Sequence, residues 1–300
     1  MPTPAESDVR RIVELVNRRS GTDRRMSNVW MIAPLLPIIL VVVILGVVLG
    51  LIVSAISKIG TIPQPQNATS AGRAVASAIG GIVAIYGFAI VGGYFVLFLT
   101  ALAFYYFMQR RNDHFARQQL LFSSLHRLLS DTSAKPIESV TRLGYLTEDS
   151  KSQEQQKTAG VWAVLFLFVT PIVGLLIAYR LTQDLRNHEA LQAEYRSNLT
   201  EAFRETGYQS PIFSTQKLHN RDPLLFLILS IITAGLFWIY WFYTILHDYN
   251  EHFAQQAEFE DQIVNLLRPS TPLTGRTCQN CGGSIPENAR FCPNCGTQSS

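Results

Sequence analysis

The sequence predicts an all-α integral membrane protein with a small cysteine-bearing domain at its carboxyl terminus. Apolar residues make up 48% of the 300-residue chain and charged residues only 16%, whereas soluble domains average about 25% charged residues. The apolar residues collect in four long runs. All four cysteines lie within the last 23 residues, which excludes a disulfide scaffold for the rest of the chain.

The four apolar runs predict about four transmembrane helices, because a helix needs about 20 apolar residues to cross roughly 30 Å of hydrocarbon. The predicted spans are residues 34–57, 75–108, 161–181 and 224–246. The second run is longer than a perpendicular crossing needs, and a tilted helix absorbs the excess. The third and fourth runs carry breakers near their middles, Pro171 and Gly235. Four spans is therefore the prediction, and two spans with two re-entrant hairpins is the alternative.

The distribution of basic residues predicts a multi-pass protein of the cell membrane with both termini in the cytoplasm. Residues 1–30 contain six arginines, residues 58–73 contain two basic residues, and residues 109–158 contain eight. Because cytoplasmic loops carry the excess of Lys and Arg, residues 1–30 and 109–158 are placed inside and residues 58–73 outside. Four spans then return the carboxyl terminus to the cytoplasm.

The chain divides into four parts: a basic cytoplasmic segment (1–30), a membrane domain (31–268), a linker (269–275) and a terminal domain (276–300). Within the first part, residues 8–19 place apolar side chains at helical spacing among arginines. Such a helix either lies on anionic lipid headgroups or is solvated in the cytoplasm.

The membrane domain contains three related units, each an apolar run that ends in a tyrosine and continues into a polar helix with His-x3-Gln. Residues 112–118 and 250–256 are identical at five of seven positions. The third run matches the fourth at a shift of 64 residues. Four single spans would place the polar tail 182–222 outside and its two relatives inside. Re-entrant third and fourth runs would remove this conflict.

Two aspartate–histidine pairs, Asp184/His188 and Asp248/His252, are spaced four residues apart and so share a helical face. One hypothesis is a proton relay or a metal site assembled between repeats. The other is a polar seam that packs the tails together. The first repeat has Arg110 in place of the aspartate, and no cysteine or third ligand joins the cluster, which favours the seam.

The last repeat carries a motif of its own, Arg221-Asp222-Pro223, then Ile231-Ile232-Thr233-Ala234-Gly235, then Trp238-Ile239-Tyr240-Trp241. It resembles a widespread, uncharacterised family of small prokaryotic membrane domains. The resemblance covers about 45 residues and implies a bacterial or archaeal membrane protein. It implies no biochemical activity.

Two C-x2-C motifs close the chain, Cys278 with Cys281 and Cys292 with Cys295. Four thiolates at this spacing complete a tetrahedron around one Zn²⁺ and leave no open position, which predicts a structural zinc ion. Residues 276–297 resemble the short zinc-ribbon domains of prokaryotes. A redox dithiol pair and rubredoxin-like iron are the alternatives.

These features favour a non-enzymatic membrane protein whose cytoplasmic zinc ribbon docks a protein partner in a scaffolding role. A channel or transporter-like protein with a regulatory ribbon is the alternative, although the runs lack the buried charges of ion carriers. Nucleic acid is an improbable partner, because the net charge is +3 and only Arg276 and Arg290 lie near the ribbon. No nucleophile–base pair, phosphate loop or carboxylate dyad stands out. The stripe Gly46, Gly50 and Ser54 predicts a helix contact between copies of the chain.

Overall fold

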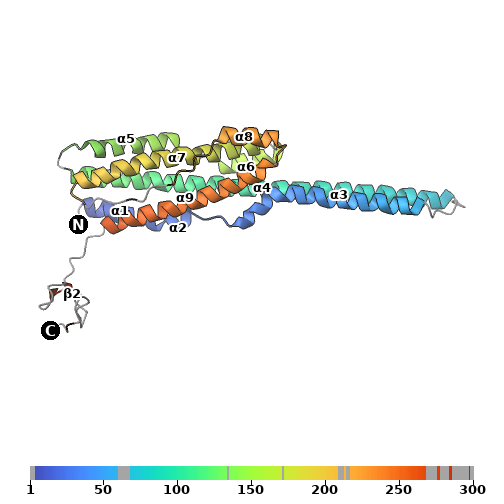
Figure 1. Cartoon of the computed structure of the whole chain (residues 1–300), viewed down its shortest axis with the longest axis horizontal. Coiled ribbons are helices and arrows are strands. Elements are labelled where there is room, and N and C mark those ends of the chain that lie inside the picture. The colour runs from blue at the N-terminus through green and yellow to red at the C-terminus, as the bar shows by residue number, and fades with distance from the viewer. Residues whose placement is uncertain are drawn as a thin grey trace.

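A long two-helix hairpin projects from one end of a helical bundle (Figure 1). The computed structural model describes residues 4–59, 68–133, 135–170, 172–208, 213, 217–267, 276–277, 284–285 and 297. Its helices are α1 (Pro4–Asn17), α2 (Arg19–Thr22), the 3-10 helix η1 (Asn28–Met31), α3 (Ile32–Ile59), α4 (Ala68–Thr132), α5 (Glu138–Gln153), α6 (Ala159–Phe168), α7 (Ile172–Glu205), α8 (Pro223–Ile232) and α9 (Phe237–Leu267). Strands β1 (Arg276–Thr277) and β2 (Ser284–Ile285) pair antiparallel. The described chain is thus all-α apart from this short pair.

The projecting hairpin consists of α3 and the first half of α4 (Figure 1). Two helical segments in the described residues, Asn28–Ser54 and Ile79–Thr132, are long and apolar enough to cross a membrane. Their most apolar windows are 0% and 6% buried inside the structure. Gly46 and Gly50 have open space where a side chain would project. The two glycines of the small-residue stripe are therefore not in close contact with α4.

The third and fourth apolar runs form helical hairpins rather than span-length helices. α6 and α8 have ten residues each, so each is about 15 Å long. α8 ends in a turn where Ala234 and Gly235 adopt positive φ angles of 49° and 90°, and glycine takes such angles without steric cost. The ring of Phe226 then lies 5.8 Å from that of Trp241, so the chain has folded back. The structure does not show four spans.

α6 and α7 fold back in the same way around the break that the sequence predicts near Pro171, a residue that itself lies outside the described set. α6 ends at Phe168 and α7 begins at Ile172. An added Cβ on Gly174 would approach the Phe166 ring to 2.9 Å, so the two helices cross closely on either side of the turn. Both predicted breakers therefore mark turns.

The polar parts of α4, α7 and α9 run in the same direction and form the core of the bundle (Figure 1). Buried positions recur at alternating spacings of four and three residues, the heptad spacing of a coiled coil. They are Phe107, Arg111, His114, Gln118, Leu121 and Leu125 on α4; Leu181, Leu185, His188, Gln192, Tyr195 and Leu199 on α7; and Ile245, Tyr249, His252, Gln256, Phe259 and Ile263 on α9. Equivalent repeat positions thus form successive layers, and the sequence repeat is a structural repeat.

α1 and α5 cover this three-helix core. Ile12, Leu15 and Val16 of α1 are buried in one apolar cluster with Leu121 and Leu125 of α4. The sequence left two environments open for the amino-terminal helix, lipid headgroups or solvent. The structure shows neither for its apolar face. This face packs into the bundle, because the seam of α4 leaves an apolar flank that α1 covers.

Candidate metal centre

One histidine from each repeat meets in a single layer of the three-helix core. His114, His188 and His252 are 0%, 1% and 0% exposed. The Nε2 atom of His114 lies 3.3 Å from Nε2 of His188 and 3.3 Å from Nε2 of His252. One nitrogen of each ring lies within 4.8 Å of the other two, a grouping that can hold a metal ion. The repeated His-x3-Gln motif thus brings three potential ligands to one point.

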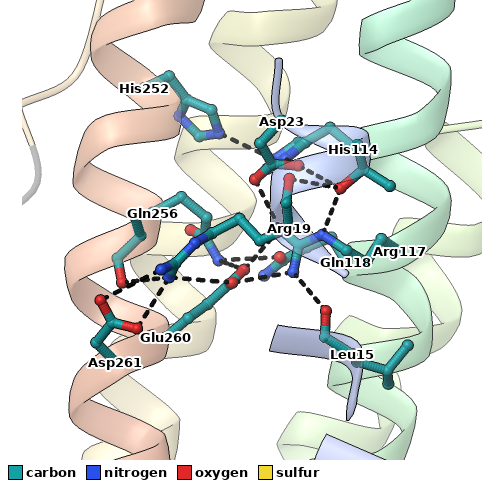
Figure 2. A network of polar contacts seen from close by, with 12 residues as sticks. Leu15, Arg19, Asp23, His114, Arg117, Gln118, His252, Gln256, Glu260 and Asp261 are labelled. Atoms are coloured by element: carbon teal, nitrogen blue, oxygen red, sulfur yellow. Dashed lines mark hydrogen bonds and ion pairs between the residues drawn. The ribbon is translucent and has the colours of Figure 1, made fainter. Parts of the chain in front are cut away.

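A carboxylate faces the outer nitrogen of each imidazole. Nδ1 of His188 lies 2.6 Å from Oε1 of Glu154, at the carboxyl end of α5. Nδ1 of His114 lies 3.0 Å from Oδ1 of Asp23 (Figure 2), and Nδ1 of His252 lies 3.4 Å from Oε1 of Glu189. A carboxylate in this position can hold the proton on Nδ1, so that Nε2 is the nitrogen that offers a lone pair. The Nε2 atom of His114 faces those of His188 and His252, and each ring has a carboxylate on its other side.

Burial disfavours protonation of two of these imidazoles, His114 and His252. Burial lowers the pKa of His114 despite the nearby Asp23 carboxylate. It lowers the pKa of His252 to about 3, although Glu189 acts in the opposite direction. Burial on its own would raise the pKa of Asp23, but His114 and Arg117 together lower it well below the usual range. Neutral imidazole is the form that binds metals.

The glutamines of the repeat form the next layer. Gln256 donates from Nε2 to Oε1 of Gln118 at 2.9 Å, and its own Oε1 accepts from Arg196 at 3.1 Å. Gln192 reaches the histidine layer, with Nε2 placed 2.9 Å from Nε2 of His188. Oε1 of Gln192 and Nε2 of Gln118 are buried without a hydrogen-bond partner among the described residues. The layer is thus only partly satisfied.

Arg117 joins the histidine layer to the amino-terminal segment. Its guanidinium contacts Oδ2 of Asp23 at 2.7 Å and Oε1 of Glu260 at 2.8 Å. It also donates to Oγ1 of Thr22 at 2.9 Å and to the carbonyl of Leu15 at 3.5 Å (Figure 2). Its side chain is 3% exposed. One buried cation therefore holds α4, α9 and the segment after α2 together.

The aspartates of the two predicted pairs have cationic partners other than their paired histidines. Asp184 contacts Nε of Arg111 at 3.1 Å and is also paired with Lys157. Asp248 accepts two hydrogen bonds from Arg221, at 2.5 and 3.1 Å. The expectation that no third ligand joins the cluster is therefore wrong. His114 is the third ligand, and the acids facing the three rings are Asp23, Glu154 and Glu189.

Arg110 takes the place of the aspartate in the first repeat, and its partners are aromatic rings and an asparagine rather than charged groups. Its guanidinium lies over the rings of Phe107, Tyr249 and Phe253, at 5.1, 5.2 and 5.6 Å. It also donates to Oδ1 of Asn250 at 2.9 Å. Because α9 supplies most of these partners, the substitution strengthens the contact between the first and last repeats.

The second candidate centre lies in the terminal domain. Its predicted ligands Cys278, Cys281, Cys292 and Cys295 fall outside the described residues, as does the linker 269–275. Thr277 pairs with Ser284 across the β1–β2 ladder, so the chain on both sides of the first C-x2-C motif is held together. Four thiolates from two C-x2-C motifs are a donor set that fits tetrahedral Zn²⁺.

Comparison with known proteins identifies this terminal domain. Residues 277–299 match the zinc-ribbon domain family, and the match contains all four cysteines. No curated protein and no solved structure matches the chain. The carboxyl-terminal segment is therefore a zinc-ribbon domain, and zinc binding follows from it.

Replacing Arg117 by methionine should destabilise the bundle strongly. The change removes the guanidinium that contacts Asp23 and Glu260, and leaving buried charges unpaired costs about 3–5 kcal/mol. Arg142→Met is the control, because its ion pair with Glu194 is about half exposed and exposed pairs contribute less than about 1 kcal/mol. Denaturant unfolding of the chain in detergent measures both. Equal effects of the two variants would contradict the assigned role of Arg117.

Replacing Cys278 or Cys292 by serine should remove the zinc of the ribbon and leave the bundle intact. The four cysteines follow the last helix and a predicted linker, and metal binding supplies the folding energy of so small a domain. We expect loss of one zinc ion per chain by elemental analysis, with unchanged helical circular dichroism. Unchanged zinc content in both variants would exclude these ligands.

Proposed function

We propose that this chain is a non-enzymatic integral membrane protein with a cytoplasmic bundle, whose zinc ribbon docks a protein partner in a scaffolding role. In this proposal α3 and the first half of α4 cross the membrane. α6 and α8 enter it only partway, each as the first half of a re-entrant hairpin. The termini and the polar parts of α4, α7 and α9 lie in the cytoplasm.

Exposed apolar surface on the α3–α4 hairpin is the observation that carries the proposal. Val42 and Val53 of α3 are 62% and 65% exposed, and Val91 of α4 is 71% exposed. Leaving such side chains in water costs about 25 cal/mol for each Å² of apolar surface. Because no described part of the chain covers the hairpin, lipid is the environment that removes this cost.

The tips of the two shorter hairpins support a re-entrant arrangement. Phe168, at the end of α6, is 80% exposed, and Ile232, at the end of α8, is 74% exposed. A ten-residue helix reaches only about 15 Å, half of the hydrocarbon thickness. Apolar tips on half-length helices suit insertion into one leaflet. This topology keeps all three polar tails on one side, as their parallel packing requires.

The docking role rests on the character of the ribbon. Four thiolates fill the coordination sphere of zinc, so the ion has no open position for catalysis. The ribbon carries few cations, with Arg276 and Arg290 near its ligands, which favours a protein partner over nucleic acid. The open stripe of Gly46 and Gly50 supports a second contact, between copies of the chain within the membrane.

Single-cysteine labelling tests the topology. With the four native cysteines replaced by serine, cysteines are introduced at positions 70, 152, 210 and 300 and exposed to an impermeant maleimide in whole cells. Two spans with two re-entrant hairpins predict labelling at position 70 alone. Four spans predict labelling at 70 and 210. Labelling at 300 would contradict both topologies and the cytoplasmic ribbon.

Site-specific photo-crosslinking tests the docking role. A photoreactive residue at position 298 of the full-length chain should give one dominant protein adduct in cells, and Cys278→Ser should abolish it. The same probe at Ser152, an exposed residue of α5, is the matched control. Absence of a zinc-dependent adduct, together with ion flux in liposomes, would favour the channel alternative.

A further inference from the structure

We propose that His114, His188 and His252 bind one divalent transition-metal ion of the zinc class through their Nε2 atoms, at a site separate from the ribbon. The site lies inside the three-helix core, where each repeat contributes one ligand. Such an ion would hold the three repeats in register.

The spacing of the imidazole nitrogens suits this ion. Zn–N bonds of about 2.0–2.1 Å in a tetrahedral site place two ligand nitrogens about 3.3–3.4 Å apart. Nε2 of His114 lies 3.3 Å from Nε2 of His188 and 3.3 Å from Nε2 of His252. Two of the three nitrogen pairs are therefore already at the separation that a bound ion requires, and all three ligand atoms lie within 4.8 Å of one another.

The direction of the lone pairs also calls for a cation. When the Nδ1 protons are directed toward Asp23, Glu154 and Glu189, the three Nε2 atoms are acceptors that converge on the axis of the bundle. Histidine ligands of metals usually donate their other N–H to a carboxylate in this way. Without a cation, two acceptor nitrogens 3.3 Å apart repel each other, and burial excludes the solvent that would screen them.

The buried carboxylate of Glu154 also needs a nearby positive charge. It is 6% exposed, and His188 is the partner that contacts its carboxylate among the described residues. Its second oxygen, Oε2, is buried without a hydrogen-bond partner. A buried carboxylate is costly without a compensating positive charge. A divalent ion on Nε2 of His188 supplies that charge through the imidazole.

Gln192 is placed to complete the coordination. Its amide nitrogen lies 2.9 Å from Nε2 of His188, and its amide oxygen is buried without a partner among the described residues. The nitrogen and oxygen of an amide are exchanged by a half-turn. That half-turn brings the oxygen toward the histidines, where it can serve as the fourth ligand.

The donor set excludes the other common metals. Three neutral imidazoles suit Zn²⁺ and the neighbouring divalent transition metals, whereas Ca²⁺ and Mg²⁺ require oxygen ligands. The competing explanation is a polar layer that only specifies helix register, as buried polar residues do in coiled coils. The stacking of Phe115 on His188, with ring centroids 4.2 Å apart, is compatible with both. Metal content distinguishes the two.

Zinc stoichiometry of the purified full-length chain tests the proposal. We expect two zinc ions per chain in the unmodified protein, one after all four cysteines are replaced by serine, and none when His114→Asn is added. His247→Asn in the cysteine-free chain is the matched control, because His247 lies on α9 with its side chain half exposed. Cobalt loading of the cysteine-free chain should give the visible absorption of tetrahedral Co²⁺, and His114→Asn should abolish it.

A second variant keeps all three histidine ligands, so that a loss of metal binding can be separated from misfolding of the His114→Asn chain. Glu154→Gln should weaken Zn²⁺ or Co²⁺ binding about 10- to 100-fold, as loss of a ligand's carboxylate partner does, while Glu148→Gln on the exposed face of the same helix should not. A folded cysteine-free chain that binds neither ion would overturn the proposal. So would binding that survives His114→Asn unchanged. Neither outcome affects the membrane topology or the ribbon.

Discussion

Parallel packing of the three polar helices is the constraint on which the rest of the structure depends. Parallel neighbours require that each repeat begin at the same end of the bundle. α6 and α8 meet this requirement, because each runs ten residues outward and folds back before the long helix begins. The turn at Gly235, with its φ of 90°, allows α9 to run in this direction. A straight helix through the fourth run would reverse α9 and separate His252 from its partners.

The three-helix core contains several polar residues at its seam positions. These residues form hydrogen bonds and ion pairs mainly with other polar groups. Arg111, His114 and Gln118 occupy consecutive seam positions of α4 and are almost fully buried. Arg111 donates to the carbonyl of Gln155 and lies over the ring of Phe115. Burying such groups is favourable only when their hydrogen bonds are made. The covering elements α1, α2 and α5 are needed for this reason, since they and the segments that follow them supply Leu15, Asp23 and Glu154.

The sequence predicted the apolar runs, the repeat, the breakers at Pro171 and Gly235, and the zinc-ribbon motif, because each is a local pattern. It did not distinguish a kinked span from a hairpin, since a breaker in an apolar run is compatible with both. The histidine layer was missed for a different reason. Asp184 and His188 share a helical face, but the acids that face His114 and His188 come from distant segments at positions 23 and 154. Contacts between segments so far apart in the chain follow from tertiary packing, which spacing along one helix cannot reveal.

The two candidate metal centres differ in which parts of the chain they connect. The ribbon lies beyond Leu267, where α9 ends, so we expect its zinc to stabilise the ribbon's own fold. The histidine layer joins all three repeats, and Glu189 links it further to His219, which donates its backbone N–H to that carboxylate at 2.6 Å. His219 precedes α8 by a few residues, so the same network reaches the start of the α8–α9 hairpin. A change at the histidine layer would therefore act on the register of the three repeats and on the start of α8 together, whereas a change at the ribbon would act beyond the last helix.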